Sequence, residues 1–241
     1  ILARIKLCDV LLKGPTTTPH GGTMESANVT MRRELDLYAN VRPVSIPEQG
    51  IDWMFYRENT EGEYVLGSRG LDLPGMAVDF KVPTDLGPRR IARAAFEYAK
   101  NNGKSRVSIV TKANIMKKTD GKFARIAREI AAAEYPSLTV EDWYIDIMTA
   151  KLVDTRGRSD FQVFLLPIFL VLEEVRPTTG ASVHISFLVT ERREIDTGSS
   201  NALVQIRSSH RQHTPLAASH YPYLTIAVRQ SKQEIYGMDT S

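Results

Sequence analysis

The chain has 241 residues, of which 42% are hydrophobic and 24% charged, proportions typical of a folded globular protein rather than a disordered one. Its formal net charge of +3 is too small to indicate binding to nucleic acid or to an anionic membrane surface. The single cysteine, Cys8, excludes an intrachain disulfide, and the longest apolar run, 161–172, is shorter than the roughly 20 residues that span a bilayer.

Short elements alternate along the first part of the chain. The pattern predicts a buried strand over 8–12, a helix over 27–37 that Ser26 would cap, and a strand over 50–56. The glycine-containing stretch 65–82 alternates apolar and polar residues, which predicts a hairpin or a projecting arm.

The middle of the chain has the clearest periodicity. Helices are predicted over 88–102, 121–133 and 145–153, and strands over 106–112, 138–143 and 161–166. Because strands and helices alternate at the spacing of βαβ units, we predict an α/β fold. After Pro167 serine and threonine become frequent, and only short alternations at 183–189 and 224–228 suggest further strands.

Candidate anion-binding groups come early in the chain. The segment 13–22 combines glycines, hydroxyls and a lysine; it could approach an anion, although an ordinary proline and glycine turn accounts for it as well. Ser26, Asn28 and Arg32 lie near the first turns of one predicted helix, and Arg42 follows it. Such donors suit a carboxylate, while a helix cap with solvated arginines is the alternative.

Further charged residues follow predicted strands. Arg57 and Tyr64 bound the polar segment RENTEGEY, Lys112 ends a strand, and Asp146 begins a helix, where a carboxylate can also serve only to complement the helix dipole. Ligands of α/β proteins bind at strand ends. Cationic residues together with one tyrosine and one carboxylate indicate a polycarboxylate substrate.

Five longer segments form ordered motifs: LLKGPTTTP (11–19), ESANVTMRRELDLYANVRP (25–43), RENTEGEY (57–64), TKANIMKKTDGKF (111–123) and WYIDIMTAKLV (143–153). They resemble the β-decarboxylating dehydrogenases, the isocitrate and 3-isopropylmalate dehydrogenases, over residues 1–167. The resemblance is closest to isocitrate dehydrogenase. It implies the two-domain α/β fold of isopropylmalate dehydrogenase, with 1–42 in the large domain and 43–167 as the small domain carrying a clasp-like arm near 65–82.

The resemblance also implies roles for individual residues. Thr17 and Thr18 would lie near the nicotinamide of NAD or NADP, with Thr18 also touching the substrate. The substrate carboxylates would be bound by Ser26, Asn28, Arg32, Arg42 and Arg57. Tyr64 and Lys112 would be the catalytic residues that transfer protons, and Asp146 would bind Mg²⁺ or Mn²⁺.

The reaction implied is the oxidative decarboxylation of isocitrate to 2-oxoglutarate. Ser26 and Asn28 favour isocitrate because isopropylmalate enzymes usually have more apolar residues there, whereas Glu25 departs from some isocitrate enzymes, which have a basic residue. The alternatives are 3-isopropylmalate dehydrogenase and a non-catalytic or regulatory relative that binds a tricarboxylate without turnover. A homodimer with shared active sites follows, because the family's counterparts of Lys112 and Asp146 serve the partner's site. The compartment implied is the cytoplasm, or the mitochondrion in a eukaryote.

The resemblance ends at Pro167. The family continues with N-L-x-G-D-x-x-x-D, whose aspartates complete the metal site, whereas residues 168–174 here read IFLVLEE. The glycine-rich segment that opens family members is also absent. We therefore expect a fragment that is incomplete at both ends, with an irregular tail over 168–241 and little or no activity of its own.

Overall fold

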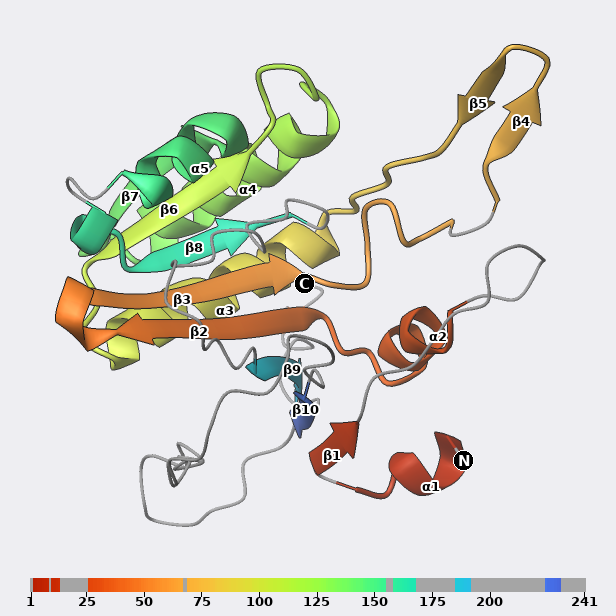
Figure 1. Cartoon of the computed structure of the whole chain (residues 1–241), viewed down its shortest axis with the longest axis horizontal. Coiled ribbons are helices and arrows are strands. Elements are labelled where there is room, and N and C mark those ends of the chain that lie inside the picture. Colours follow the sequence, from red (N-terminus) through yellow and green to blue (C-terminus); the bar gives the residue numbers. More distant parts are fainter. Residues whose placement is uncertain are drawn as a thin grey trace, which may run out of the picture.

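Figure 1 shows the computed structural model of the chain. It describes residues 2–8, 10–13, 26–66, 69–154 and 158–167, and the backbone of two strands beyond them. The helices are α1 (Leu2–Ile5), α2 (Ala27–Glu34), α3 (Leu86–Asn101), α4 (Thr119–Glu134) and α5 (Ile145–Val153), with 3-10 turns at Pro47–Gln49 and Arg158–Asp160. The strands are β1 (Val10–Lys13), β2 (Ala39–Ile46), β3 (Ile51–Glu58), β4 (Leu71–Leu73), β5 (Met76–Val78), β6 (Arg106–Thr111), β7 (Thr139–Tyr144), β8 (Val163–Leu166), β9 (Ile185–Glu191) and β10 (Leu224–Gln230).

Eight strands form one sheet in the order β1-β10-β9-β2-β3-β8-β6-β7. Strands β3, β8, β6 and β7 are parallel, so their carboxyl ends meet at one edge of the sheet. Strand β2 is antiparallel to β3 and pairs Ala39 with Glu58, so β2 begins where β3 ends. The carboxyl edge of the sheet therefore collects residues from five separate segments.

One face of the sheet is covered by α3 and α4 (Figure 1). Helix α4 buries Phe123, Ile126, Ala127 and Ile130, whose spacing puts all four on one side of a 3.6-residue helix. Helix α3 contributes Ile91, Ala92, Ala95, Phe96 and Ala99 to the same core. Both predicted helices are confirmed, with α3 running over 86–101 and α4 over 119–134.

The other face of the sheet is covered by α5. Because side chains alternate along a strand, β8 sends Val163 and Leu165 to the first core and Phe164 and Leu166 to the second. The ring of Phe164 stacks on Phe55, with centroids 4.4 Å apart and planes at 10°. Burial on both faces explains why β8 reads as a continuous apolar run.

The predicted arm is a separate two-stranded hairpin of β4 and β5, which projects from the body in Figure 1. Gly75 forms its turn with a φ of +80°, a conformation that favours glycine. Its base is closed by an antiparallel bridge, in which Gly62 and Val82 exchange N–H···O bonds of 3.2 and 3.1 Å. Leu71 on β4 and Met76 on β5 are 52% and 54% exposed, so the arm presents apolar surface.

The α/β class is confirmed, and several details differ from prediction. The strand predicted as buried over 8–12 is β1, which begins at Val10, and Val10 is 56% exposed. Helix α2 ends at Glu34 rather than at residue 37, because Asp36 adopts a φ of +50° and Leu37 turns into a buried position. Strand β2 was not predicted; it crosses the expected domain boundary at 42/43, which remains a prediction. The alternations at 183–189 and 224–228 correspond to β9 and β10, and most of 168–241 lies outside the described residues.

Among the described helices, none combines the length and hydropathy needed to cross a membrane.

Candidate functional site

Three of the predicted site residues lie at the carboxyl edge of the sheet. Arg57 is next to the end of β3 and is 9% exposed. Lys112 directly follows β6, and Asp146 is in the first turn of α5, directly after β7. Strands β6 and β7 end in register, with Thr111 opposite Tyr144, so the two segments that follow them start side by side.

Lys112 and Asp146 form a direct ion pair. The Lys112 Nζ donates a hydrogen bond of 2.8 Å to Asp146 Oδ1, with side chains 32% and 61% exposed. This hydrogen bond holds the pKa of the Asp146 carboxyl below its usual value. The lysine is thus fixed at the rim of the sheet while remaining in reach of a ligand.

Arg42 lies on β2, opposite the end of β3. Its Nε donates a hydrogen bond of 2.9 Å to the Oδ1 of Asn40, which is buried. Asn40 is in turn the register partner of Arg57. Two of the predicted substrate arginines therefore occupy adjacent strands near the same end of the β2–β3 pair.

The remaining described candidates gather around α2. Ser26 precedes the helix, but its hydroxyl makes no capping bond to it, which corrects the expected cap. The Asn28 Oδ1 is buried and has no hydrogen-bond partner among the described residues. The guanidinium carbon of Arg32 lies 6.0 Å from the centroid of the Tyr64 ring, so α2 meets the segment that follows β3.

Lys13, at the end of β1, belongs to the same neighbourhood. Burial lowers the pKa of its ammonium group, and the positive charge of Arg32 lowers it further. The segment with Thr17 and Thr18, which follows β1, lies outside the described residues. Their predicted contact with the nicotinamide stays a prediction.

The loop after β3 is held by Glu58, a residue that was not among the predicted site residues. Glu58 is 3% exposed, and its carboxylate accepts hydrogen bonds from Thr60 N (3.0 Å), Thr60 Oγ1 (2.8 Å) and Glu61 N (2.7 Å). Burial raises the pKa of Glu58, and these hydrogen bonds oppose that effect. An acidic residue at the end of an apolar strand was the available signal. The loop that leads to Tyr64 is therefore anchored at its start.

The comparison with protein families settles the kinship of the chain. The profile of the isocitrate/isopropylmalate dehydrogenase family matches residues 2–167. The chain belongs to this family. Members are oxidoreductases, and the predicted resemblance over 1–167 is confirmed.

Comparisons with individual relatives support the same family. Catalytic subunit 5 of the mitochondrial NAD isocitrate dehydrogenase of Arabidopsis thaliana is 42% identical over 172 residues, or 69% of this chain and 45% of that protein. The chloroplastic 3-isopropylmalate dehydrogenase of Solanum tuberosum is 41% identical over 172 residues, or 69% and 47%. The crystal structure of isocitrate dehydrogenase from Methylococcus capsulatus superposes with a TM-score of 0.58 at 38% identity, covering 66% of this chain and 48% of that one. The chain thus spans about half the length of the relatives it matches.

Asp146 and its described neighbours do not provide a site for a divalent metal. Asp146 brings one carboxylate, and its Oδ1 is engaged by Lys112. Within the described ranges, no group of three histidine, cysteine, aspartate or glutamate side chains is placed to hold a metal. Since Mg²⁺ requires near-octahedral oxygen coordination, the described residues do not build a metal site by themselves.

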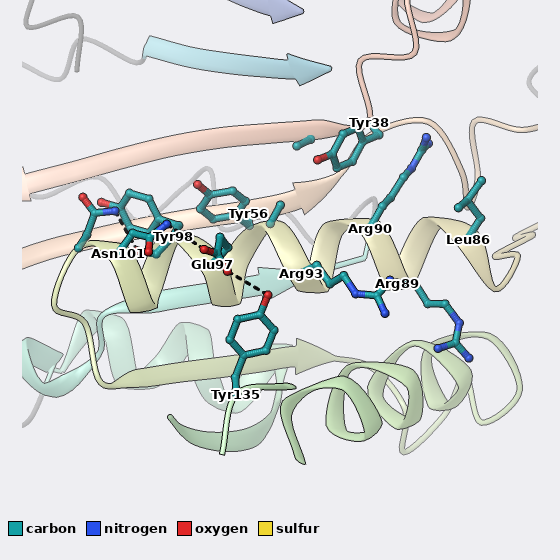
Figure 2. A pocket seen from close by; sticks show the side chains of 13 residues that line it. Tyr38, Tyr56, Leu86, Arg89, Arg90, Arg93, Glu97, Tyr98, Asn101 and Tyr135 are labelled. Carbon is teal, nitrogen blue, oxygen red and sulfur yellow. Dashed lines mark hydrogen bonds between the residues drawn. The ribbon is translucent and has the colours of Figure 1, made fainter. Parts of the chain in front are cut away.

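A separate hollow of about 550 Å³ runs along α3 (Figure 2). None of the predicted site residues lines it. Several of its charged groups are paired: Arg90 lies 4.7 Å from the Tyr38 ring centroid and binds Asp36 at 2.8 Å, and Tyr135 donates a 3.1 Å hydrogen bond to Glu97. These contacts tie α3 to its neighbours, which is a structural role.

Proposed function

We propose that the chain carries the substrate-binding part of an NAD-linked oxidative decarboxylase that converts isocitrate to 2-oxoglutarate. The observation that carries the proposal is the contact of Arg32 with Tyr64, which joins a carboxylate-binding helix to a proton donor. Arg42 and Arg57 supply further positive charge from adjacent strands near the carboxyl edge. Arginine suits carboxylates because its fork of donors binds them in two-point geometry.

The choice of isocitrate depends on the start of α2. Isocitrate carries a third carboxylate where isopropylmalate carries an isopropyl group, so a polar neighbour favours isocitrate and an apolar one favours isopropylmalate. Ser26 and Asn28 are both polar, and each carries a hydrogen-bond donor, the Ser26 hydroxyl and the Asn28 amide N–H. A carboxylate accepts hydrogen bonds from such donors, whereas an isopropyl group cannot.

The chain's own residues would divide the chemistry. The nicotinamide, when bound near Thr17 and Thr18, supplies the acceptor for the hydride. Arg32, Arg42 and Arg57 would bind and orient the carboxylates. Lys112 would relay the hydroxyl proton as the alcohol becomes a ketone, passing one of its own protons on as it receives that proton, and Tyr64 would donate a proton to the carbon that loses carbon dioxide. Asp146 would keep Lys112 oriented.

The family resemblance implies a partner subunit. Strand β8 separates β3 from β6, which places Arg57 and Lys112 two strand spacings apart, roughly 10 Å along the strand-to-strand direction. In this proposal Lys112 and Asp146 complete the site of a second subunit, within a homodimer that the apolar arm helps to join. The Arabidopsis relative is named as a subunit, so a related second chain is the competing assembly.

The test is calorimetric titration of the purified chain with isocitrate and with 3-isopropylmalate, followed by an assay of NADH or NADPH formation with Mg²⁺. We expect isocitrate to bind more tightly, and exchange of Arg32 for lysine to weaken that binding. Arg128→Lys, on the exposed side of α4, is the matched control. Tighter binding of 3-isopropylmalate would reverse the substrate assignment, and no tricarboxylate binding at millimolar concentration would contradict the proposal.

A non-catalytic or regulatory relative is the second candidate. It is favoured by the single carboxylate that the described residues bring to the metal position. Binding of isocitrate without formation of reduced nucleotide would select it over the enzyme. For either function we keep the expectation of a cytoplasmic protein, or a mitochondrial one in a eukaryote, and of 1–42 and 43–167 as parts of two domains.

A further inference from the structure

A buried ion pair between Asp120 and Lys81 lies next to the backbone of Lys112. Asp120, in the first turn of α4, is 0% exposed. Its Oδ2 accepts a hydrogen bond of 2.7 Å from the backbone N–H of Lys112. Its Oδ1 lies 2.6 Å from the Nζ of Lys81, whose side chain is 11% exposed. That second contact is an ion pair rather than an aligned hydrogen bond, since Oδ1 accepts none among the described residues.

The backbone of Lys112 is held on both sides. While Asp120 binds its N–H, its carbonyl oxygen accepts hydrogen bonds from Ile115 N (3.0 Å) and Met116 N (2.8 Å). The side chain then extends from this fixed position to Asp146, 2.8 Å away. Since the Cα position of Lys112 is defined by these bonds, the position of its Nζ depends on Asp120.

Lys81 ties the same carboxylate to the base of the arm. It precedes Val82, which forms the bridge to Gly62 that closes the arm. Its Nζ also lies 3.3 Å from Glu63 Oε1. A buried carboxylate is tolerated when it is paired and hydrogen-bonded, and Lys81 and the Lys112 N–H meet both conditions for Asp120.

We propose that Asp120 is a positioning residue for Lys112, and that Lys81 holds Asp120 in place, so that the base of the arm and the reactive lysine move as one unit. The inference rests on the proposed function only for the role of Lys112 in proton transfer. The contacts themselves are independent of substrate, metal and nucleotide, and so is the test below.

The experiment is zero-length carbodiimide cross-linking of the full chain, with the Lys112–Asp146 cross-linked peptide measured by mass spectrometry. The reagent joins an amine to a carboxylate only when they touch, so its yield reports the position of Lys112 Nζ. We expect Asp120→Ala to lower the yield about fivefold or more, and Lys81→Met to lower it as well. Asp120→Asn retains an acceptor for the Lys112 N–H but loses the ion pair with Lys81, so it should lower the yield less than Asp120→Ala and about as much as Lys81→Met.

Hydrogen exchange on the same samples distinguishes positioning from general stability. We expect Asp120→Ala to remove protection from the Lys112 amide while the buried β6 amides of 107–110 keep theirs. Lys122→Met is the matched control, because Lys122 is on the same helix but pairs with the exposed Asp85 at 2.6 Å. It should leave both readouts unchanged.

Three results would overturn the inference. An unchanged cross-link yield in Asp120→Ala would show that the lysine is positioned otherwise. Loss of protection throughout β6 would make the pair a general stability element. Absence of the cross-link in the unmodified chain would show that Lys112 and Asp146 are not in contact. Failure of the proposed function has a different signature, the absence of isocitrate binding with both readouts intact.

Discussion

The guanidinium of Arg32 lies against the ring of Tyr64, with 6.0 Å between its carbon and the ring centroid. Arg32 is on α2 and Tyr64 follows β3, so the contact joins two segments that the chain order separates. We predict that Arg32→Lys weakens isocitrate binding about 10- to 100-fold, because the two-point fork is lost. Tyr64→Phe should leave the affinity within about twofold, because it keeps the ring and removes only a hydroxyl assigned to proton transfer. Titration calorimetry measures both, and equal losses in the two variants would contradict the division of roles.

The second prediction concerns the core beneath α5. Phe164 is 0% exposed and contacts the rings of Phe55, Trp53 and Phe161. Phe164→Ala should lower the free energy of unfolding by about 3–5 kcal/mol, because it creates a cavity between β8 and α5. Leu86→Ala, at a site that is 56% exposed, is the control and should change it by less than about 0.5 kcal/mol. Urea denaturation measures both, and similar midpoints for the two variants would contradict the packing.

The third prediction is an alkaline titration. Burial, the negative charge of Glu97 and the hydrogen bond to Glu97 together raise the pKa of Tyr135 to about 12. Because the folded value lies above the ordinary one of about 10, stability from the protonated phenol is complete below pH 10 and is lost as the pH rises through 12. Glu97→Gln should lower the pKa of Tyr135 without restoring the ordinary value, since burial remains. The absorbance of the phenolate as a function of pH measures the pKa of Tyr135, with Tyr135→Phe as the blank. An unchanged titration in Glu97→Gln would exclude the electrostatic contribution of Glu97.

The fourth prediction concerns the arm. Leu71 and Met76 expose apolar side chains on β4 and β5, which belong to a hairpin outside the main sheet. If the arm joins two subunits, Leu71→Asp and Met76→Asp should shift the assembly toward monomer, because a charge would be buried in the interface. Sedimentation velocity measures the change, and Leu7→Asp, at an 84% exposed site on the body, is the control. An assembly that survives both arm substitutions would contradict the proposal.

The local periodicity of apolar residues was sufficient to predict the helices that bury one face. Helix α5 was predicted with the bounds that the structure has, 145–153, and the ends of α3 and α4 differ from prediction by one or two residues. Strand β2 was missed because Pro43 and the polar residues around it lack a clear alternation. Pro43 is accommodated because β9 pairs only with residues 39–41, which leaves the rest of β2 without a second neighbour.

The sequence by itself determined the α/β class, the family motifs and the residue types of the candidate site, because these depend on side-chain chemistry and short-range spacing. The tertiary structure alone decided which of those residues meet. The pairing of β6 with β7 brings Lys112 to Asp146, and the insertion of β8 between β3 and β6 separates Lys112 from Arg57. The fold of the arm brings Lys81 to Asp120. Strand order and buried ion pairs are long-range contacts, and no local pattern in the chain encodes them.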